Sequence, residues 1–501
     1  MPRIARRPPG CGADELRSAI ERFLSGARKP ALLEPGEELL PITADNFAIH
    51  HRNASLSVQA WDQKRNVVRR VAAIREETAG RLELQVERFA RKEGRLFLVD
   101  LSRPAGHDFA RRGARLVFRE RLRIFLNREF PGWDLAELTT EPDLQRSLSA
   151  VYPRALLRKG RYAWAAIGAP PESDHSGVLS FGLIWLDHLR RRHEGRLTIE
   201  GLVLYLPEGR ERSTCLRLAY IHPEAARCEL FVYSEDGFVA HLDPRDAGNL
   251  DTRLEPCRRP AEHDDAPELA ALLQLPEVES VRKQDGSLSL RVRGLEFAQA
   301  SAGRLAFGLR EHVAAGPHNL AEIRSLASNL AGWRAPSADR EHPLYRVNPE
   351  AWLESQVRAN LEQIDASLLP DPVYGQVPAF AGGERGVFDL LAVDRSGRLA
   401  VLELKASADL HLPLQALDYW MRVKWHLDRD EFSACGYFPG SALRAEAPRL
   451  LLISPALDFH PTTETILGFL SPAVDVERIG VGVEWRRRLE VMFRLSGAQR
   501  P

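Results

Sequence analysis

The first hundred residues change from a helical to a strand-like pattern of apolar positions. The range Ala13–Ala27 carries Leu16, Ile20 and Phe23 at helical spacing, which predicts an amphipathic helix. Further along, five runs of strand character are separated by short polar or glycine-containing turns. These runs are 46–50, 55–61, 67–75, 81–88 and 95–101. We therefore predict that residues 1–105 form a helix and a β-rich module, either a curled sheet or a barrel.

The next segment alternates between helical and strand-like patterns. Residues 113–130 form a basic amphipathic pattern that Pro131 and Gly132 end, which predicts a helix. A strand is predicted at 162–168. The order then becomes helix, strand, helix, strand, at 179–192, 201–206, 213–220 and 228–233. These patterns predict a mixed α/β domain over residues 106–260.

The same order of elements returns near the C-terminus. There it falls at 412–427, 449–453, 463–469 and 476–483. Two explanations stay open: an ancient duplication, which would make the middle domain a degenerate copy of the last domain, and a chance alternation of helices and strands. No hairpin ahead of the middle segment carries the Asp and Glu-x-Lys pattern described below, so such a copy would be inactive.

Two linker-like stretches rich in proline and charge separate a third region from its neighbours. They lie at 256–267 and 335–343. Between them, a strand is predicted at 287–293 and a helix at 320–333. We therefore predict a small α/β connector over residues 261–340 and a last domain over residues 341–501.

The last domain contains a hairpin pattern. The apolar runs 387–393 and 399–404 flank Asp394-Arg-Ser-Gly397, a sequence typical of a tight turn. If the hairpin closes in the middle of this turn, Asp389 and Glu403 lie equally far from it along the chain. The two acids are then expected to face each other across the strands.

Asp389, Glu403 and Lys405 make this hairpin chemically unusual. Directly opposed side chains have Cβ atoms about 4.5–5.5 Å apart, and like charges so placed repel each other. Lys405 shares the face of Glu403 because side chains alternate along a strand. A divalent cation would relieve the repulsion between the two carboxylates. We therefore interpret the three residues as a metal-dependent active site.

Lysine is scarce in this chain, which makes Lys405 more informative. Only seven of the 69 lysine and arginine residues are lysine, a bias that indicates a GC-rich genome. A structural cation in such a chain would most easily be arginine. Lysine differs from arginine in being a compact donor whose pKa shifts readily on burial, which suits it to catalysis.

Residues 344–495 resemble the PD-(D/E)XK nuclease superfamily, and within it the RecB-type and NucS-type endonucleases. The superfamily pattern is an acid on one strand, followed on the next strand by Glu or Asp, any residue and Lys. Here these residues are Asp389 and Glu403-Leu404-Lys405. Phe388 stands where the name of the superfamily has Pro, a position that carries no chemistry.

Two helices around the hairpin extend the resemblance. In these branches the preceding helix carries Glu, and here Glu354 lies in a predicted helix at 349–361, with Glu350 as a rival. The following helix carries Gln and Tyr, and here Gln415 and Tyr419 have the i, i+4 spacing of one helix face. The resemblance implies a restriction-endonuclease-like αβββαβ core within an α+β multidomain protein.

The resemblance also implies Mg²⁺-dependent hydrolysis of phosphodiester bonds, which we expect to be those of DNA. Asp389, Glu403, Glu354 and the backbone carbonyl of Leu404 would bind Mg²⁺ or Mn²⁺, ions that prefer hard oxygen donors. Lys405 would orient the attacking water or stabilise developing negative charge.

The remaining candidate residues would hold the substrate or the metal shell. Gln415 and Tyr419 would position the metal shell or the nucleic-acid backbone. Arg385, Arg422 and Lys424 are candidates for contacts to phosphate, which fix register and carry no sequence preference.

Interpretations without catalysis stay open. Asp389 and Lys405 could form a buried ion pair, with Glu403 at a sheet edge. The protein would then be a non-catalytic nucleic-acid-binding protein that keeps the nuclease fold. A third interpretation is an interaction protein whose residues 1–340 dock to a partner protein of a repair or defence system.

Composition narrows these expectations. The chain of 501 residues has zero net charge and a pI of about 7.3, so any nucleic-acid surface must be a local patch. Its five cysteines are scattered without CxxC spacing, which predicts neither a zinc site nor a disulfide framework. We find no signal-peptide pattern and no run of the ~18 apolar residues that span a membrane, so we expect a cytoplasmic protein. The oligomeric state is left open.

Overall fold

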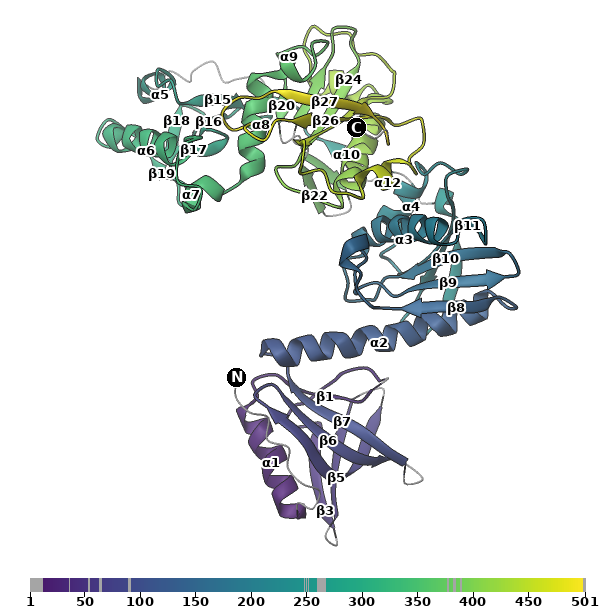
Figure 1. The fold of residues 1–501 in the computed structure, drawn as a ribbon. Coiled ribbons are helices and arrows are strands. Elements are labelled where there is room, and N and C mark those ends of the chain that lie inside the picture. The colour runs from purple at the N-terminus through teal and green to yellow at the C-terminus, as the bar shows by residue number, and fades with distance from the viewer. Residues whose placement is uncertain are drawn as a thin grey trace. The chain divides into compact units, whose positions relative to one another are not determined.

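The computed structural model combines helices with several sheets, coloured along the chain in Figure 1, as the α+β class requires. It describes residues 12–35, 37–52, 55–62, 65–88, 92–246, 248, 250, 252–258, 267–375, 378–381, 384–387 and 390–498. The chain divides into two compact units. The first comprises 1–178, 189–208 and 231–240, and the second 179–188, 209–230 and 241–501.

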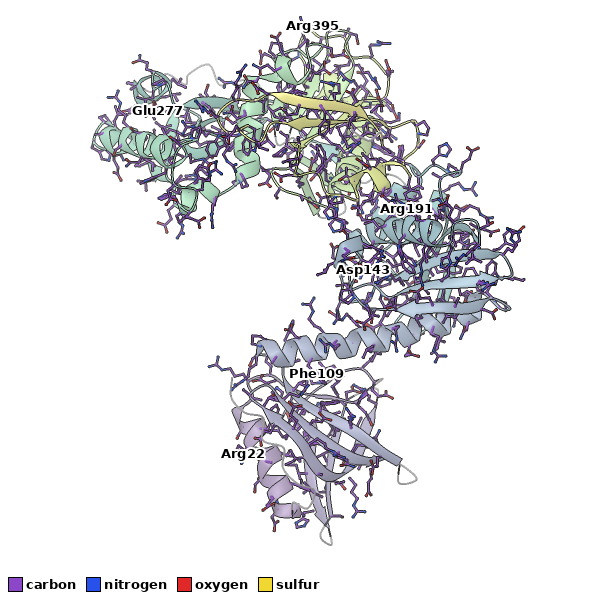
Figure 2. All side chains as sticks on the ribbon, viewed as in Figure 1. Arg22, Phe109, Asp143, Arg191, Glu277 and Arg395 are labelled. Atoms are coloured by element: carbon purple, nitrogen blue, oxygen red, sulfur yellow. The ribbon has the colours of Figure 1, made fainter. Side chains whose placement is uncertain are left out.

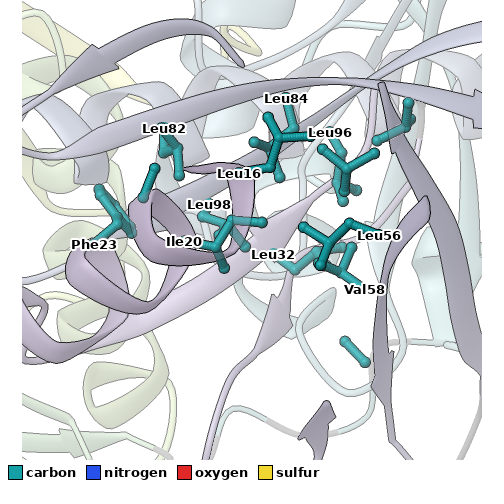
Figure 3. Close-up of a cluster of buried hydrophobic side chains, with 14 of the residues drawn as sticks. Leu16, Ile20, Phe23, Leu32, Leu56, Val58, Leu82, Leu84, Leu96 and Leu98 are labelled. Atoms are coloured by element: carbon teal, nitrogen blue, oxygen red, sulfur yellow. The ribbon is translucent and has the colours of Figure 1, made fainter. Parts of the chain in front are cut away.

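The N-terminal module packs one helix against an antiparallel sheet. Helix α1 (Ala13–Gly26) buries Leu16, Ile20 and Phe23 among leucines of the sheet (Figure 3). The strands are β1 (Pro30–Leu33), β2 (Leu40–Pro41), β3 (Phe47–Arg52), β4 (Ser55–Trp61), β5 (Asn66–Thr78), β6 (Arg81–Arg88) and β7 (Lys92–Asp100), in the order β2-β1-β7-β6-β5-β4-β3. The predicted helix and five strands are confirmed. The short β1 and β2 were not predicted, because two to four residues show too little alternation.

Helix α2 (Pro104–Glu129) begins nine residues before its predicted start at residue 113. The early part has few apolar positions, so apolar spacing does not reveal it. Pro104 lies in the first turn, where a fixed φ and a missing N–H favour helix initiation. Phe118 and Leu122 are buried against the sheet that follows in the chain.

The middle sheet begins as an antiparallel meander and becomes parallel. Its elements are β8 (Asp134–Thr139), β9 (Arg154–Lys159), β10 (Tyr162–Gly168), α3 (Val178–Arg192), β11 (Thr198–Pro207), α4 (Arg212–Leu218), β12 (Arg227–Tyr233) and β13 (Val239–Leu242). The strand order is β13-β12-β11-β10-β9-β8. Strands β8, β9 and β10 are antiparallel neighbours, whereas β10 and β11 are parallel and joined through α3. The predicted elements from residue 162 onward are confirmed; β8 and β9 were not predicted.

The connector is a second antiparallel meander flanked by helices. It contains α5 (Pro267–Leu273), β15 (Glu279–Arg282), β16 (Leu288–Val292), β17 (Leu295–Ser301), β18 (Arg304–Phe307), β19 (Val313–Ala314) and α6 (Leu320–Trp333). The predicted helix at 320–333 is confirmed. Most of the meander was not predicted, although β16 matches the single predicted strand. Residues 259–266 of the first predicted linker lie outside the described residues.

The C-terminal domain is built on a mixed sheet. Its helices are α7 (Pro343–Arg346), α8 (Pro349–Ala359), α9 (Leu361–Ile364), α10 (Leu412–Leu427), α11 (Glu431–Ala434) and α12 (Thr463–Leu467). Its sheet has the order β20 (Tyr374–Gly375), β23 (Leu390–Val393), β24 (Leu399–Leu404), β25 (Arg449–Pro455), β26 (Asp475–Val481) and β27 (Val491–Ser496). The first three strands are antiparallel, β24, β25 and β26 are parallel, and β27 returns antiparallel to β26.

One predicted strand is divided between two sheets. The run 387–393 was expected to be continuous, but Val387 belongs to β22 (Glu384–Val387) and β23 begins at Leu390. Strand β22 pairs with β21 (Pro378–Ala381), which also pairs with β14 (Thr252–Leu254). Strand β24 ends at Leu404 and therefore has no residue left to pair with residues 384–387. These residues pair with β21 instead.

Across the described residues, every helix is too short or too polar to cross a lipid bilayer.

Candidate active site

The hairpin of β23 and β24 has the predicted register. Leu390 lies opposite Leu402 and Ala392 opposite Ala400, as a turn centred between the two strands requires. The carboxylate of Asp394 fixes the turn by accepting the backbone N–H groups of residues 396 and 398, at 2.8 and 2.9 Å. The neighbouring Arg395 is exposed at this turn (Figure 2). Asp389 and Phe388 lie outside the described residues.

Strand β24 presents different chemistry on its two faces. Leu402 and Leu404 belong to the core formed with Trp352 and Leu353 of α8. Since side chains alternate along a strand, Glu403 projects from the opposite face, where α10 contacts β24 and β25. Glu403 is only 3 % exposed. The strand therefore carries a buried carboxylate on the α10 side of the sheet.

Lys405 lies between two carboxylates at the end of this strand. Its Nζ is 3.7 Å from Oε1 of Glu403 and 3.8 Å from Oδ2 of Asp409, and its side chain is 23 % exposed. The other oxygen of Asp409 accepts the backbone N–H of His411 at 2.8 Å, just before α10. Asp409 thus links the ammonium to the start of the helix, a role that the sequence pattern did not reveal.

Two histidines near Asp409 were also missed. The Nδ1 of His411 lies 3.3 Å from the hydroxyl of Ser180, and the Nδ1 of His460 lies 2.7 Å from that of Thr462. Burial lowers the pKa of His460; the charge of Asp409 opposes this shift and His411 adds to it. His411 and His460 follow β24 and β25 respectively. In α/β sheets, functional sites lie at the carboxyl ends of parallel strands. The position of the two histidines directly after predicted strands could therefore have identified them from the sequence.

Glu354 is buried in α8, but its visible partners are arginines. It is 5 % exposed, and its Oε1 lies 3.0 Å from Nη2 of Arg358 and 3.5 Å from Nη1 of Arg291. Arg291 comes from β16 of the connector. A structural role explains these contacts, because the ion pair with Arg291 joins the connector to α8. The predicted metal-binding role of Glu354 stays a prediction.

The predicted residues of α10 lie on its partly exposed side. Gln415 and Tyr419 are half-buried and one turn apart, as expected from their spacing. The guanidinium of Arg422 lies 5.9 Å from the centre of the Tyr419 ring. Lys424 is paired with Asp428, with 2.9 Å from Nζ to each carboxylate oxygen. Their contacts to metal or phosphate stay predictions.

Arg385 falls in β22, apart from the sheet that carries Glu403. Its side chain lies outside the described residues, so its predicted phosphate contact stays a prediction.

The donors at this site match the predicted ion in chemical type. Glu403 offers a buried carboxylate, and Leu404 ends the same strand with its backbone carbonyl, both being oxygen donors of the kind that Mg²⁺ and Mn²⁺ take. Within the described ranges, no group of three or more His, Cys, Asp or Glu residues is arranged to hold a metal. Asp389, the second predicted carboxylate, is outside those ranges.

Comparison of the sequence with known protein families found no match, and comparison with curated proteins found none either.

Proposed function

We propose that the C-terminal domain is a metal-dependent nuclease of the PD-(D/E)XK type, which hydrolyses phosphodiester bonds of DNA. The observation that carries the proposal is the ammonium of Lys405, placed 3.7 Å from the buried carboxylate of Glu403 and 3.8 Å from that of Asp409. Lys405 directly follows the buried strand β24, lies between two acids and keeps 23 % of its side chain exposed.

The order of elements around this lysine supports the same proposal. Helix α8 precedes three antiparallel strands, and α10 then crosses to the parallel β25. This order supports the αβββαβ core that the resemblance implies. The pairing of Leu390 with Leu402 agrees with the hairpin that the sequence predicts, in which Asp389 and Glu403 face each other.

Each residue then has a defined chemical task. A divalent cation, when bound by Glu403, Asp389 and the Leu404 carbonyl, would polarise the phosphate and acidify a water molecule. Lys405 would stabilise negative charge that develops on the phosphate oxygens. Asp409 would hold Lys405 in place through their ion pair. Gln415 and Tyr419 would contact the nucleic-acid backbone from α10.

A second candidate function is binding without catalysis by a domain of the same fold. It is favoured by Glu354, whose Oε1 is engaged by two arginines. In that case the domain would bind nucleic acid, or a partner protein, without cutting.

Cleavage assays on plasmid and single-stranded DNA, with Mg²⁺ or Mn²⁺, separate these candidates. We expect the parent to cut, and Lys405→Ala and Glu403→Gln to lose at least about a hundredfold in rate. Lys283→Ala is a matched control, because Lys283 is also paired with a glutamate, Glu296, at 2.8 Å but lies in the connector. Equal cleavage by the parent and the two site variants would exclude this site. DNA retention without cleavage would favour the second candidate.

A further inference from the structure

The middle sheet and the C-terminal sheet have the same strand order and the same directions at their centres. In the middle domain, antiparallel β8, β9 and β10 are followed by α3 and the parallel β11. In the C-terminal domain, antiparallel β20, β23 and β24 are followed by α10 and the parallel β25. Each sheet then adds a strand reached through a short helix, β12 through α4 and β26 through α12, and ends on one more strand. If helices and strands alternated in both regions by chance, nothing would require the two sheets to share their strand order and strand directions.

One hydrogen bond aligns the two sheets residue by residue. The N–H of Lys405, just past β24, donates to the carbonyl of Ile453 on β25 at 3.0 Å. The N–H of Ala169, just past β10, donates to the carbonyl of Tyr205 on β11 at 2.9 Å. Ala169 is therefore the counterpart of Lys405, and Ile167 the counterpart of Glu403.

The counterpart positions in the middle domain carry no site chemistry. Ile167 and Ala169 are apolar and buried. Ile167 pairs with Arg154 of β9, so Arg154 occupies the position that the sequence analysis assigns to Asp389 in the C-terminal hairpin. The buried guanidinium of Arg154 donates to backbone carbonyls, that of Ser149 at 3.0 Å among them. A cation and two apolar side chains stand where the C-terminal domain has its predicted acids and lysine.

Equivalent segments of the two copies also pair with each other, within the second compact unit. Ile221 is the third residue after α4, Leu470 is the third residue after α12, and the two form an antiparallel bridge. His222 N–H donates to Phe469 O, and Ser471 N–H donates to Tyr220 O, both at 2.8 Å. Each bond is the image of the other when the two segments are exchanged.

Side chains on α4 and just after it contact α10 and reinforce this bridge. Arg217 makes a bidentate ion pair with Asp418, at 2.8 and 2.7 Å, and its side chain is only 5 % exposed. Tyr220 packs edge-on against Trp420, with ring centres 5.1 Å apart. The contact is thus buried and charge-complementary.

From these observations we infer that residues 104–242 are a second copy of the C-terminal fold that has lost its site, and that the chain therefore cuts one strand of a duplex per encounter. The cutting step rests on the proposed function. In that step a water oxygen bonds to phosphorus and one phosphorus–oxygen bond to a sugar breaks. The leaving oxygen takes up a proton, so the products are a phosphate monoester end and a hydroxyl end. A duplex has two strands to cut, and of the two copies only the C-terminal one carries the predicted site residues, so one encounter cuts one strand.

The test is a time course on supercoiled plasmid with Mg²⁺, with the 501-residue chain limiting and Lys405→Ala in parallel. Nicked circles should accumulate first, and linear DNA should form only later from separate nicks. Linear DNA that appears as early as nicked circles would overturn the one-site inference and leave the proposed function standing. If the parent does not cut, or if Lys405→Ala cuts equally well, the proposed function fails and the nicking step fails with it.

A readout without activity tests the pairing of the copies. Ile221→Ser and Leu470→Ser should lower Tm by similar amounts, and the double variant should lower it by clearly less than their sum, because both residues serve one contact. Phe432→Ser, which removes a buried residue of α11 outside the bridge, should add fully to either variant. Full additivity of Ile221→Ser and Leu470→Ser would overturn the pairing.

Discussion

The ammonium of Lys405 lies 3.7 Å from a carboxylate oxygen of Glu403, whose side chain is only 3 % exposed. Burying a carboxylate costs free energy, and a nearby cation offsets part of that cost. The effect of changing either residue should therefore depend on whether the other is present.

Lys405→Met is expected to lower the free energy of unfolding by about 1–3 kcal/mol, because it removes this cation from a buried carboxylate. The double variant Lys405→Met, Glu403→Gln should recover part of the loss, since a neutral amide then replaces the buried carboxylate. Urea unfolding of the parent, both single variants and the double variant at pH 7 measures the coupling. A double variant that loses the sum of the two single losses would show that the residues are energetically independent.

Asp409 is expected to act on Lys405 and not on the substrate. Asp409→Asn keeps an acceptor for the N–H of His411 but removes the charge 3.8 Å from the ammonium. DNA cleavage should fall by about ten- to a hundredfold, as expected for a misplaced catalytic group, with little change in Tm. Asp428→Asn is the control, because Asp428 pairs with Lys424 at the same i, i+4 spacing. Equal losses of cleavage rate in the two variants would show that Asp409 has no special role.

Much of the C-terminal fold is predictable because local signals agree with tertiary pairing. Asp394 and Gly397 mark a turn, and that turn alone sets the register of Leu390 on Leu402. Helix α10 begins and ends where predicted, with Pro413 in its first turn and an apolar face that packs on the sheet. In these places the sequence pattern and the hydrogen-bond partners specify the same structure.

Other features depend on contacts that no local pattern encodes. Arg291 meets Glu354 from 63 residues away. Asp409 and His460 come near each other only because two parallel strands end at the same edge of the sheet. Such proximity requires the fold to be known.

His460 is expected to make stability depend on pH. Burial lowers its pKa, with Asp409 opposing and His411 reinforcing the shift, so the folded state keeps the imidazole neutral. The unfolded chain begins to bind the proton near the usual pKa of about 6.5. The stabilising contribution is therefore present above that pH and is lost as the pH falls toward the lower folded pKa. His460→Gln should flatten the fall of Tm between about pH 7.5 and 5.

The control for this pH profile is His312→Gln, because His312 is exposed and lies in the connector. It should leave the profile of the parent unchanged. If Tm falls as steeply with pH in His460→Gln as in the parent, the pH dependence belongs to other groups.

Glu354 is expected to be structural, in contrast to Glu403. Glu354→Gln removes the charge that faces Arg358 and the nearly buried Arg291, and should lower the free energy of unfolding by about 1–3 kcal/mol. If a metal binds at Glu403, Mn²⁺ should raise the Tm of the parent and of Glu354→Gln but not that of Glu403→Gln. Glu362→Gln is the control, because Glu362 pairs with Arg395 on the surface, where ion pairs contribute little. Loss of the Mn²⁺ shift in Glu354→Gln would instead make Glu354 a metal ligand, as the sequence pattern predicts.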